Sequence, residues 1–557
     1  MEAPLSGDPP AGRGGESLST RWVRAETPRT LPDRIRSWLL ADAPAAPAGV
    51  AGLQVPLAVT LAVFAAAFLV PAWPWLSGRV TIPWDAKSQF FPQLQFLATS
   101  IAHGEWPWWT PNVFAGWPQI SDPQSLMFSP LHVLLALFNS AISLRAFDAV
   151  IFAYLCLGGI GIILFFRDRG WHAGGAVVAA LAFAFGGAAS ARLQHIGQVM
   201  SLVYMVLVLW LLARALDRGS WRAGLAAGAI AGLMAIGRDQ VALLSLYVLA
   251  GYVAAHWFVG AGVIERMRAS VKPLAAVVLS GTLLVAVPVV MTTLLAARSN
   301  RPEISFATAA AGSIHPLHLL QLVFADLFAA MDPNVEYWGP DTPAWDAAWG
   351  RPGLYFSQNM PLVYAGALPV LAIVSFGLIR GLAWSRDIRF FAIAAALMLF
   401  YAIGTYTPVF HLMYELPFVA LYRRALDATF VLCALLAILA GYLVHRWLSG
   451  TVPPATRAQR AMEIGCAAGL IVTVLVVAFP VVGLDPVIIP VVTAVVFTAA
   501  SIGILVLARQ ANAYAPLLPV VLLALFIAVD LRWNNAPHIS TAMPREHFEA
   551  LRQGTHD

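Results

Sequence analysis

The chain has 557 residues, of which 59% are hydrophobic and only 11% are charged, and its mean hydropathy is +0.74. A soluble domain carries roughly 25% charged residues, so this composition excludes a soluble globular protein and indicates a polytopic membrane protein. The formal net charge of +5 is better explained by arginines in loops than by nucleic-acid binding. All three cysteines lie inside apolar runs, so the sequence predicts neither a disulfide framework nor a cysteine metal site: Cys156, Cys433 and Cys466.

The first fifty residues differ in composition from the rest of the chain. Residues 1–50 are polar and rich in Pro, Ala, Gly and Arg, and they lack the apolar core and cleavage site of a signal peptide. We therefore expect a largely disordered cytoplasmic tail there. A transmembrane domain over residues 51–531 follows, and residues 532–557 form a short tail after the last predicted span.

The transmembrane domain consists of apolar runs of about 16 to 25 residues, close to the roughly 20 that an α-helix needs to cross a bilayer. Backbone groups in lipid must be hydrogen-bonded internally, so helices are the expected spanning elements. The predicted fold is all-α and polytopic, with about 13 transmembrane helices. The spans are predicted near 53–76, 147–166, 173–190, 198–214, 222–237, 241–260, 273–296, 361–380, 390–404, 428–446, 464–483, 487–508 and 515–531. The run 131–137 is too short to span and is interpreted as a re-entrant or interfacial piece.

Basic residues predict the orientation of these spans. They are concentrated in one set of short loops, which the positive-inside rule places in the cytoplasm; these loops are 167–169, 214–222, 265–272, 380–389, 446–460 and the loop at Arg509. The N-terminus is then cytoplasmic and the C-terminus periplasmic. The loops 77–130, 297–360 and 405–427 face the outside, and any chemistry is expected on that face.

The first of these outer loops has an unusual composition. It combines many prolines and tryptophans with the charged residues Asp85, Lys87, Glu105 and Asp122. Proline removes backbone donors, so we expect a structured loop with short interfacial helices rather than a span. Tryptophan rings favour the boundary between lipid headgroups and water. A loop that only anchors the fold at the interface remains the alternative.

Several sequence blocks resemble a known family. The blocks are WDAKSQFFPQL, GEWPWWTPNVFAGWP and SDPQSLMFSP in the first outer loop, and later GRDQVALLSLYVL and LYRRALDATF. Together they resemble the YfhO-like bacterial membrane proteins, a family that is similar to the GT-C glycosyltransferases. The sequence departs from the family pattern at Arg238, Asp239, Arg424 and Ala425.

The resemblance implies a GT-C-like enzyme of the bacterial inner membrane. Such an enzyme moves a sugar from a polyprenyl-phosphate donor to a lipid or cell-envelope glycan acceptor on the outer face. In that superfamily the first outer loop carries a functional acid soon after the first span, and Asp85 occupies that place. The sequence does not identify the sugar or the acceptor. A non-enzymatic protein that binds or transports lipid or glycan is the alternative.

Glycosyl transfer needs a base for the acceptor proton and a group that stabilises the departing phosphate. Asp85 is the candidate base, and its structural alternative is to cap a short helix that begins near Ala86. Asp122 is the second candidate acid. Its structural alternative is to form the turn before Pro123.

Arginine suits phosphate because its planar group presents paired donors. Arg423 and Arg424 stand side by side before a span, where they bind either the donor phosphate or ordinary anionic headgroups. Lys87, in the first outer loop, is a further candidate substrate-binding residue. So are three residues at the ends of apolar runs on the same face, each of which is alternatively a structural interfacial residue: Arg192, His195 and Arg238.

The sequence neither requires nor excludes a metal ion. His315 and His318 have a helical spacing but no matching set of cysteines or carboxylates, which disfavours a metal site there. Asp85 and Asp122 suit Mg or Mn, the divalent cations that carboxylate and water ligands prefer. We therefore assign no certain cofactor.

Overall fold

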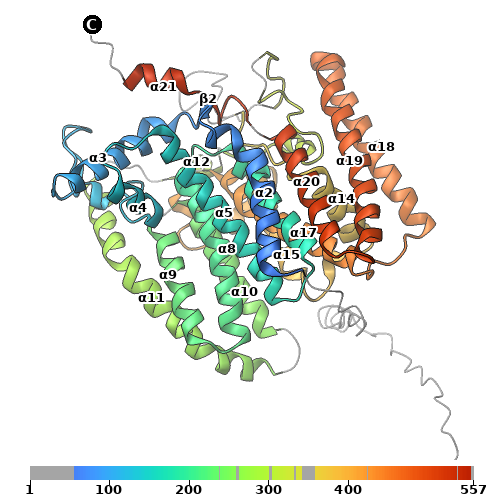
Figure 1. The fold of residues 1–557 in the computed structure, drawn as a ribbon, viewed down its shortest axis with the longest axis horizontal. Coiled ribbons are helices and arrows are strands. Elements are labelled where there is room, and N and C mark those ends of the chain that lie inside the picture. The colour runs from blue at the N-terminus through green and yellow to red at the C-terminus, as the bar shows by residue number, and fades with distance from the viewer. Residues whose placement is uncertain are drawn as a thin grey trace, which may run out of the picture. The chain divides into compact units, whose positions relative to one another are not determined.

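A computed structural model describes residues 55–237, 239–258, 262–299, 304–310, 312–331, 334–340, 358–422, 424–535 and 537–552. Within these ranges the regular secondary structure is almost entirely helical (Figure 1). The two strands in the described residues, β1 (Val80–Thr81) and β2 (Met543–Pro544), are two residues each. The predicted all-α fold is confirmed. The tail 1–50 lies outside the described residues.

Among the described residues, eleven helices are long and apolar enough to cross a membrane. They are α2 (Leu57–Leu76), α5 (Leu144–Asp168), α6 with α7 (Ala173–Phe185 and Gly187–Ala191), α8 (Ile196–Asp217), α10 (Gln240–Phe258), α11 (Val263–Ala297), α15 with η7 (Arg389–Ile403 and Gly404–Tyr406), η9 with α17 (Ala425–Asp427 and Ala428–Leu448), α18 (Arg457–Val482), α19 (Asp485–Asn512) and α20 (Leu517–Asn534). The chain is therefore an all-α polytopic membrane protein.

The remaining elements are shorter. Two of them are apolar helices of intermediate length, α9 (Trp221–Ile236) and α14 with η5 (Ala367–Leu371 and Ala372–Ile379). The others lie in the connections: η1 (Ala86–Phe90), α3 (Phe91–Ala102), η2 (Gln119–Ser121), α4 (Pro130–Phe138), α12 (Phe306–Ala310), η3 (Pro316–Leu322), η6 (Leu382–Trp384), α16 (Val409–Tyr414), η8 (Val419–Leu421) and α21 (Arg545–Arg552).

The predicted count of thirteen spans is not confirmed by length and composition, which give eleven in the described part of the chain. The two shorter apolar helices coincide with the two remaining predicted spans. Helix α9 begins just after α8 ends. Beyond the other end of α9, the carboxylate of Asp239 accepts a hydrogen bond from Ser201, which lies near the start of α8. These contacts indicate that α9 runs antiparallel along α8. The count of thirteen stays a prediction.

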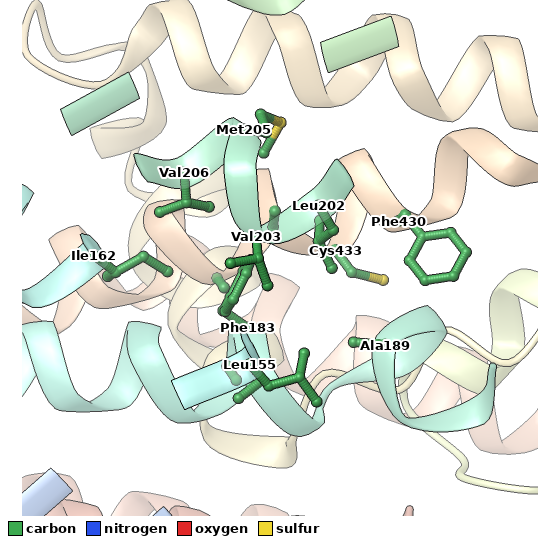
Figure 2. Packing of buried hydrophobic residues seen from close by; sticks show 14 of the residues in the cluster. Leu155, Ile162, Phe183, Ala189, Leu202, Val203, Met205, Val206, Phe430 and Cys433 are labelled. Carbon is green, nitrogen blue, oxygen red and sulfur yellow. The ribbon is translucent and has the colours of Figure 1, made fainter. Parts of the chain in front are cut away.

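Small residues allow the central helices to approach closely. A Cβ atom added to Gly175 in α6 would lie 2.3 Å from the carbonyl oxygen of Gly441 in α17, and one added to Gly441 would lie 2.4 Å from that of Gly175. Such close contact is how helices associate in lipid, where no hydrophobic effect drives them together. Figure 2 shows part of the core of the helical domain, in which Leu155, Phe183 and Leu202 come from α5, α6 and α8.

The first outer loop is joined to the C-terminal segment. Strand β1 pairs antiparallel with β2, and Val80 lies opposite Pro544. One helical turn earlier, the indole Nε1 of Trp75 donates a hydrogen bond to the carbonyl oxygen of Thr541 at 2.9 Å. Because these contacts bring the end of α2 and the segment after α20 together, both lie at the same end of the helical domain.

A buried ion pair also fastens this loop to α5. The Nζ of Lys87 lies 2.5 Å from Asp148 Oδ1, and Thr81 Oγ1 donates a hydrogen bond to Asp148 Oδ2 at 2.6 Å. Both charged side chains are almost fully buried. Burial lowers the pKa of Lys87, and the Asp148 carboxylate opposes that shift. Removing one partner of such a pair leaves an uncompensated buried charge, which costs roughly 3–5 kcal/mol.

Candidate functional site

Four segments that are far apart in the sequence meet at the end of the helical domain where the first outer loop pairs with the C-terminal segment. They are the turn before α8, the start of η1 in the first outer loop, the residues before α10 and the residues that lead into α17. Their polar side chains form what we call the polar cluster, whose members are Asp85, Arg192, His195, Gln198, Asp239, Arg424 and Asp427.

Asp427 is the centre of the polar cluster. Its carboxylate is buried and accepts hydrogen bonds from Arg192 Nη2 at 2.5 Å and from Gln198 Nε2 at 2.8 Å. Arg424 Nε lies 3.3 Å from its second oxygen. A carboxylate can be buried without a prohibitive desolvation cost only when it is paired and hydrogen-bonded in this way. No local sequence pattern indicates a role for Asp427.

Arg192 is fully buried at the end of α7 and its guanidinium group packs over the ring of Phe430, 4.7 Å from the ring centroid. Its Nη2 also donates to Gln198 Oε1 at 2.8 Å, and its Nε donates to His195 Nδ1 at 3.1 Å. The remaining nitrogen, Nη1, is buried and has no hydrogen-bond partner in the described structure. An unpaired buried donor is costly, so this atom is a candidate contact for a ligand oxygen.

His195 lies between Arg192 and the first outer loop. Its Nε2 is 3.8 Å from Asp85 Oδ2. Burial, followed by the positive charges of Arg192 and Arg424, holds the pKa of His195 well below its usual value. The imidazole is therefore neutral at physiological pH.

Asp85 is the half-exposed member of the polar cluster, with 53% of its side chain accessible. Partial burial raises the pKa of its carboxyl, and Arg424 opposes that shift. The side chain makes no capping hydrogen bond to η1, so the helix-cap alternative is wrong. Trp84, directly before it, has a φ of +56°, in the left-handed region that costs a non-glycine residue about 1–2 kcal/mol. Such strain is typical of functional sites.

Asp239 is a further acid near Asp427 that sequence analysis noted only as a departure from the family pattern. Its carboxylate accepts hydrogen bonds from Ser201 Oγ at 2.6 Å and from the backbone N–H of Ala242 at 2.9 Å. Burial raises the pKa of Asp239 to about 6, and the negative charge of Asp427 adds to the shift. The following residue, Gln240, donates a hydrogen bond to Tyr401 at 2.8 Å.

The other candidate residues from the sequence do not join the cluster. Asp122 accepts hydrogen bonds from Gln124 N at 2.8 Å and Trp117 Nε1 at 3.1 Å, as the turn-forming alternative predicts. Lys87 is committed to its buried pair with Asp148. Arg238 and Arg423 lie outside the described residues.

Within the described part of the chain, no group of three or more His, Cys, Asp or Glu side chains could hold a metal ion. His318 Nε2 is hydrogen-bonded to the hydroxyl of Tyr337 at 3.1 Å, and His315 Nδ1 accepts a hydrogen bond from the backbone of Leu317. These contacts turn the two imidazoles to separate partners. A Mg or Mn ion at Asp85 and Asp122 stays an untested prediction.

An apolar groove of about 700 Å³ is lined in part by Trp84, the residue before Asp85. Its walls come from the first outer loop and from the C-terminal segment, and they include Trp84, Phe91, Phe96, Met543 and Phe548. The short β1–β2 pairing that joins these segments therefore also holds the two walls together. Trp84 links the groove to the polar cluster because Asp85 follows it in the chain.

Neither a protein-family model nor a curated protein matches the sequence. Among solved structures, the chain is similar to the crystal structure of ArnT from Cupriavidus metallidurans bound to undecaprenyl phosphate. The TM-score is 0.44 and the sequence identity is 15%, over 86% of this chain and 76% of that chain.

Proposed function

We propose that the protein is a GT-C-type glycosyltransferase of the bacterial inner membrane that moves a sugar from a polyprenyl-phosphate donor to a lipid or cell-envelope glycan on the outer face. The observation that carries this proposal is the position of Asp85. It is a half-exposed carboxylate at the edge of a buried cluster that contains Arg192 and Arg424, and the residue before it, Trp84, lines an apolar groove.

The two arginines of the cluster supply donors for a phosphate ligand. Arg192 and Arg424 both contact the single carboxylate of Asp427, and Arg424 also acts on the carboxyl of Asp85. Arg192 Nη1 adds a donor that has no hydrogen bond in the described structure. A phosphate oxygen would satisfy this donor, and hydrogen bonds between charged groups are roughly twice as strong as neutral ones.

In the proposed reaction, the hydroxyl oxygen of the acceptor attacks the anomeric carbon of the sugar, and Asp85 accepts the proton of that hydroxyl. The bond from that carbon to the phosphate oxygen breaks, and its electron pair leaves with the phosphate. Arg192 and Arg424 then stabilise the negative charge of the departing polyprenyl phosphate. The groove that Trp84 lines suits the apolar chain of such a lipid.

The test uses the purified full-length protein in lipid nanodiscs. A panel of undecaprenyl-phosphate-linked hexoses, each labelled in the sugar, is supplied together with lipids and glycans extracted from bacterial envelopes. We expect one donor to be consumed, with the label transferred to an acceptor and undecaprenyl phosphate released. Tight binding of undecaprenyl phosphate without consumption of any donor would contradict the proposal and identify a lipid-binding protein.

A further inference from the structure

The hydrogen bond between Arg192 and His195 determines which nitrogen of the imidazole carries the proton. Arg192 Nε lies 3.1 Å from His195 Nδ1, and a guanidinium group can only donate. Nδ1 must therefore be the acceptor. In a neutral imidazole the single hydrogen is then on Nε2, the atom that faces Asp85 Oδ2 at 3.8 Å.

The donor side of this arrangement is rigid. Arg192 is held by Asp427, by Gln198 and by its packing on Phe430. The backbone also fixes the turn, because the N–H of His195 donates to the carbonyl oxygen of Arg192 at 3.0 Å. The orientation of the imidazole is consequently set by the buried ion pair between Arg192 and Asp427.

The acceptor side is less constrained. Asp85 is half exposed, and its carboxylate makes no hydrogen bond with any other described residue. A distance of 3.8 Å is about 0.6–1 Å too long for a hydrogen bond, and a rotation of the Asp85 side chain can close such a gap. Hydrogen bonds at catalytic groups are often long before substrate binds.

We propose that His195 is a positioning residue that donates its Nε2 hydrogen to Asp85, and that Asp427 sets this tautomer through Arg192. The bond orients the carboxylate and stabilises its ionised form, which is the form that can accept a proton. The charged groups that face His195 are Arg192 on its own turn, Arg424 before α17 and Asp85 in the first outer loop. This inference deepens the proposed function and rests on it for its catalytic meaning.

Two substitutions of His195 separate the two ring nitrogens. In His195→Gln the amide nitrogen reaches the position of Nε2 and can still donate to Asp85. In His195→Asn the amide oxygen takes the position of Nδ1 and can accept from Arg192, but nothing reaches Asp85. His103 is exposed and lies in the first outer loop, which also contains Asp85, so His103→Asn is the control variant.

The readout needs no substrate. Carbodiimide reacts with protonated carboxyl groups, so the labelling of Asp85, followed by peptide mass spectrometry across pH, reports its titration in the full-length protein in nanodiscs. We expect the midpoint to rise by about one pH unit in His195→Asn and to stay near the wild-type value in His195→Gln and His103→Asn, since a hydrogen bond to the ionised form lowers a carboxyl pKa. Unchanged midpoints in all variants, or a rise in Gln but not in Asn, would overturn the inference.

A second measurement does not depend on the folding of the His195 variants. The ring nitrogens of the histidines are labelled with ¹⁵N. The NMR signals of one histidine, protonated at Nε2, should differ between the wild type and Asp85→Asn. If no histidine signal changes, the contact does not exist. Both measurements are independent of sugar transfer. If both measurements give the expected result but no sugar donor is consumed in the transfer assay, the proposed function fails and the contact between His195 and Asp85 stands.

Discussion

Arg192 Nη2 lies 2.5 Å from Asp427 Oδ1, although the two residues are 235 positions apart in the chain. Both charged side chains are buried away from water. Their charges are therefore compensated by each other and by the other side chains of the polar cluster. The pair joins the turn before α8 to the start of α17 and at the same time fixes the orientation of His195. The contact that should stabilise the fold is therefore also the one on which the proposed role of His195 rests.

The first prediction concerns this pair. Asp427→Asn should lower the free energy of unfolding by roughly 3–5 kcal/mol, because it leaves the buried Arg192 guanidinium without its counter-charge. The double variant Arg192→Gln/Asp427→Asn should lose less than the sum of the two single variants, since it removes both charges. Thermal or denaturant unfolding in detergent measures all three. Additive losses would show that the two side chains do not interact.

The second prediction concerns the attachment of the first outer loop. Lys87→Met leaves the buried Asp148 carboxylate unpaired, so the loop should detach and become more sensitive to limited proteolysis. Lys87→Met/Asp148→Leu should recover much of the protection because it removes both charges. The cleavage sites are identified by mass spectrometry. Wild-type resistance of Lys87→Met would mean that the pair does not hold the loop.

The third prediction concerns Asp239, whose pKa is raised by burial to about 6 from an ordinary value of 3.8. Between these two values the folded protein binds the extra proton, so rising pH should lower stability across about pH 4–6, by up to about 3 kcal/mol. Asp239→Asn cannot titrate. The stability difference between Asp239→Asn and wild type should therefore grow with pH over this window and then level off. A difference that is independent of pH would contradict the raised pKa.

The fourth prediction concerns the phosphate. Arg424→Gln should weaken the binding of undecaprenyl phosphate about tenfold or more, because one charge-assisted contact contributes roughly 1.5–3 kcal/mol. Arg298→Gln is the matched control, since Arg298 is an exposed arginine at the end of α11. Native mass spectrometry or a fluorescent lipid in competition gives the affinities. Equal weakening in both variants would assign Arg424 to a general attraction for anionic headgroups.

The apolar runs predicted the helical fold well because a span is a local property of the sequence. The family resemblance and its position after the first span singled out Asp85, and the ends of apolar runs singled out Arg192, His195 and Arg424; the structure brings these four residues into one cluster. Asp427 could not be selected, because its partners Arg192 and Gln198 are 235 and 229 positions away and no local pattern reports such contacts.

Lys87 and Asp122 both make structural contacts in the folded loop. Each is a charged residue in an outer loop, which favoured a role in substrate binding or catalysis. In the structure Lys87 is buried against Asp148, a residue inside the span α5, and Asp122 forms a turn in its own loop. A charge in a loop does not by itself show whether the residue fastens the loop, as the pair of Lys87 with Asp148 does. That distinction depends on burial, which appears only when the helices pack.

The most direct test of the account is the fifth prediction, the rate of sugar transfer by Asp85→Asn in nanodiscs. Asn keeps the size of the side chain but cannot accept a proton, so transfer should fall by about a hundredfold or more while expression and thermal stability stay near the wild type. Asp122 forms a turn in the same loop. The variant Asp122→Asn should therefore keep the transfer rate of its folded fraction within a few-fold of the wild-type rate. Near-normal transfer by Asp85→Asn would contradict the assignment of the base and move it to Asp239.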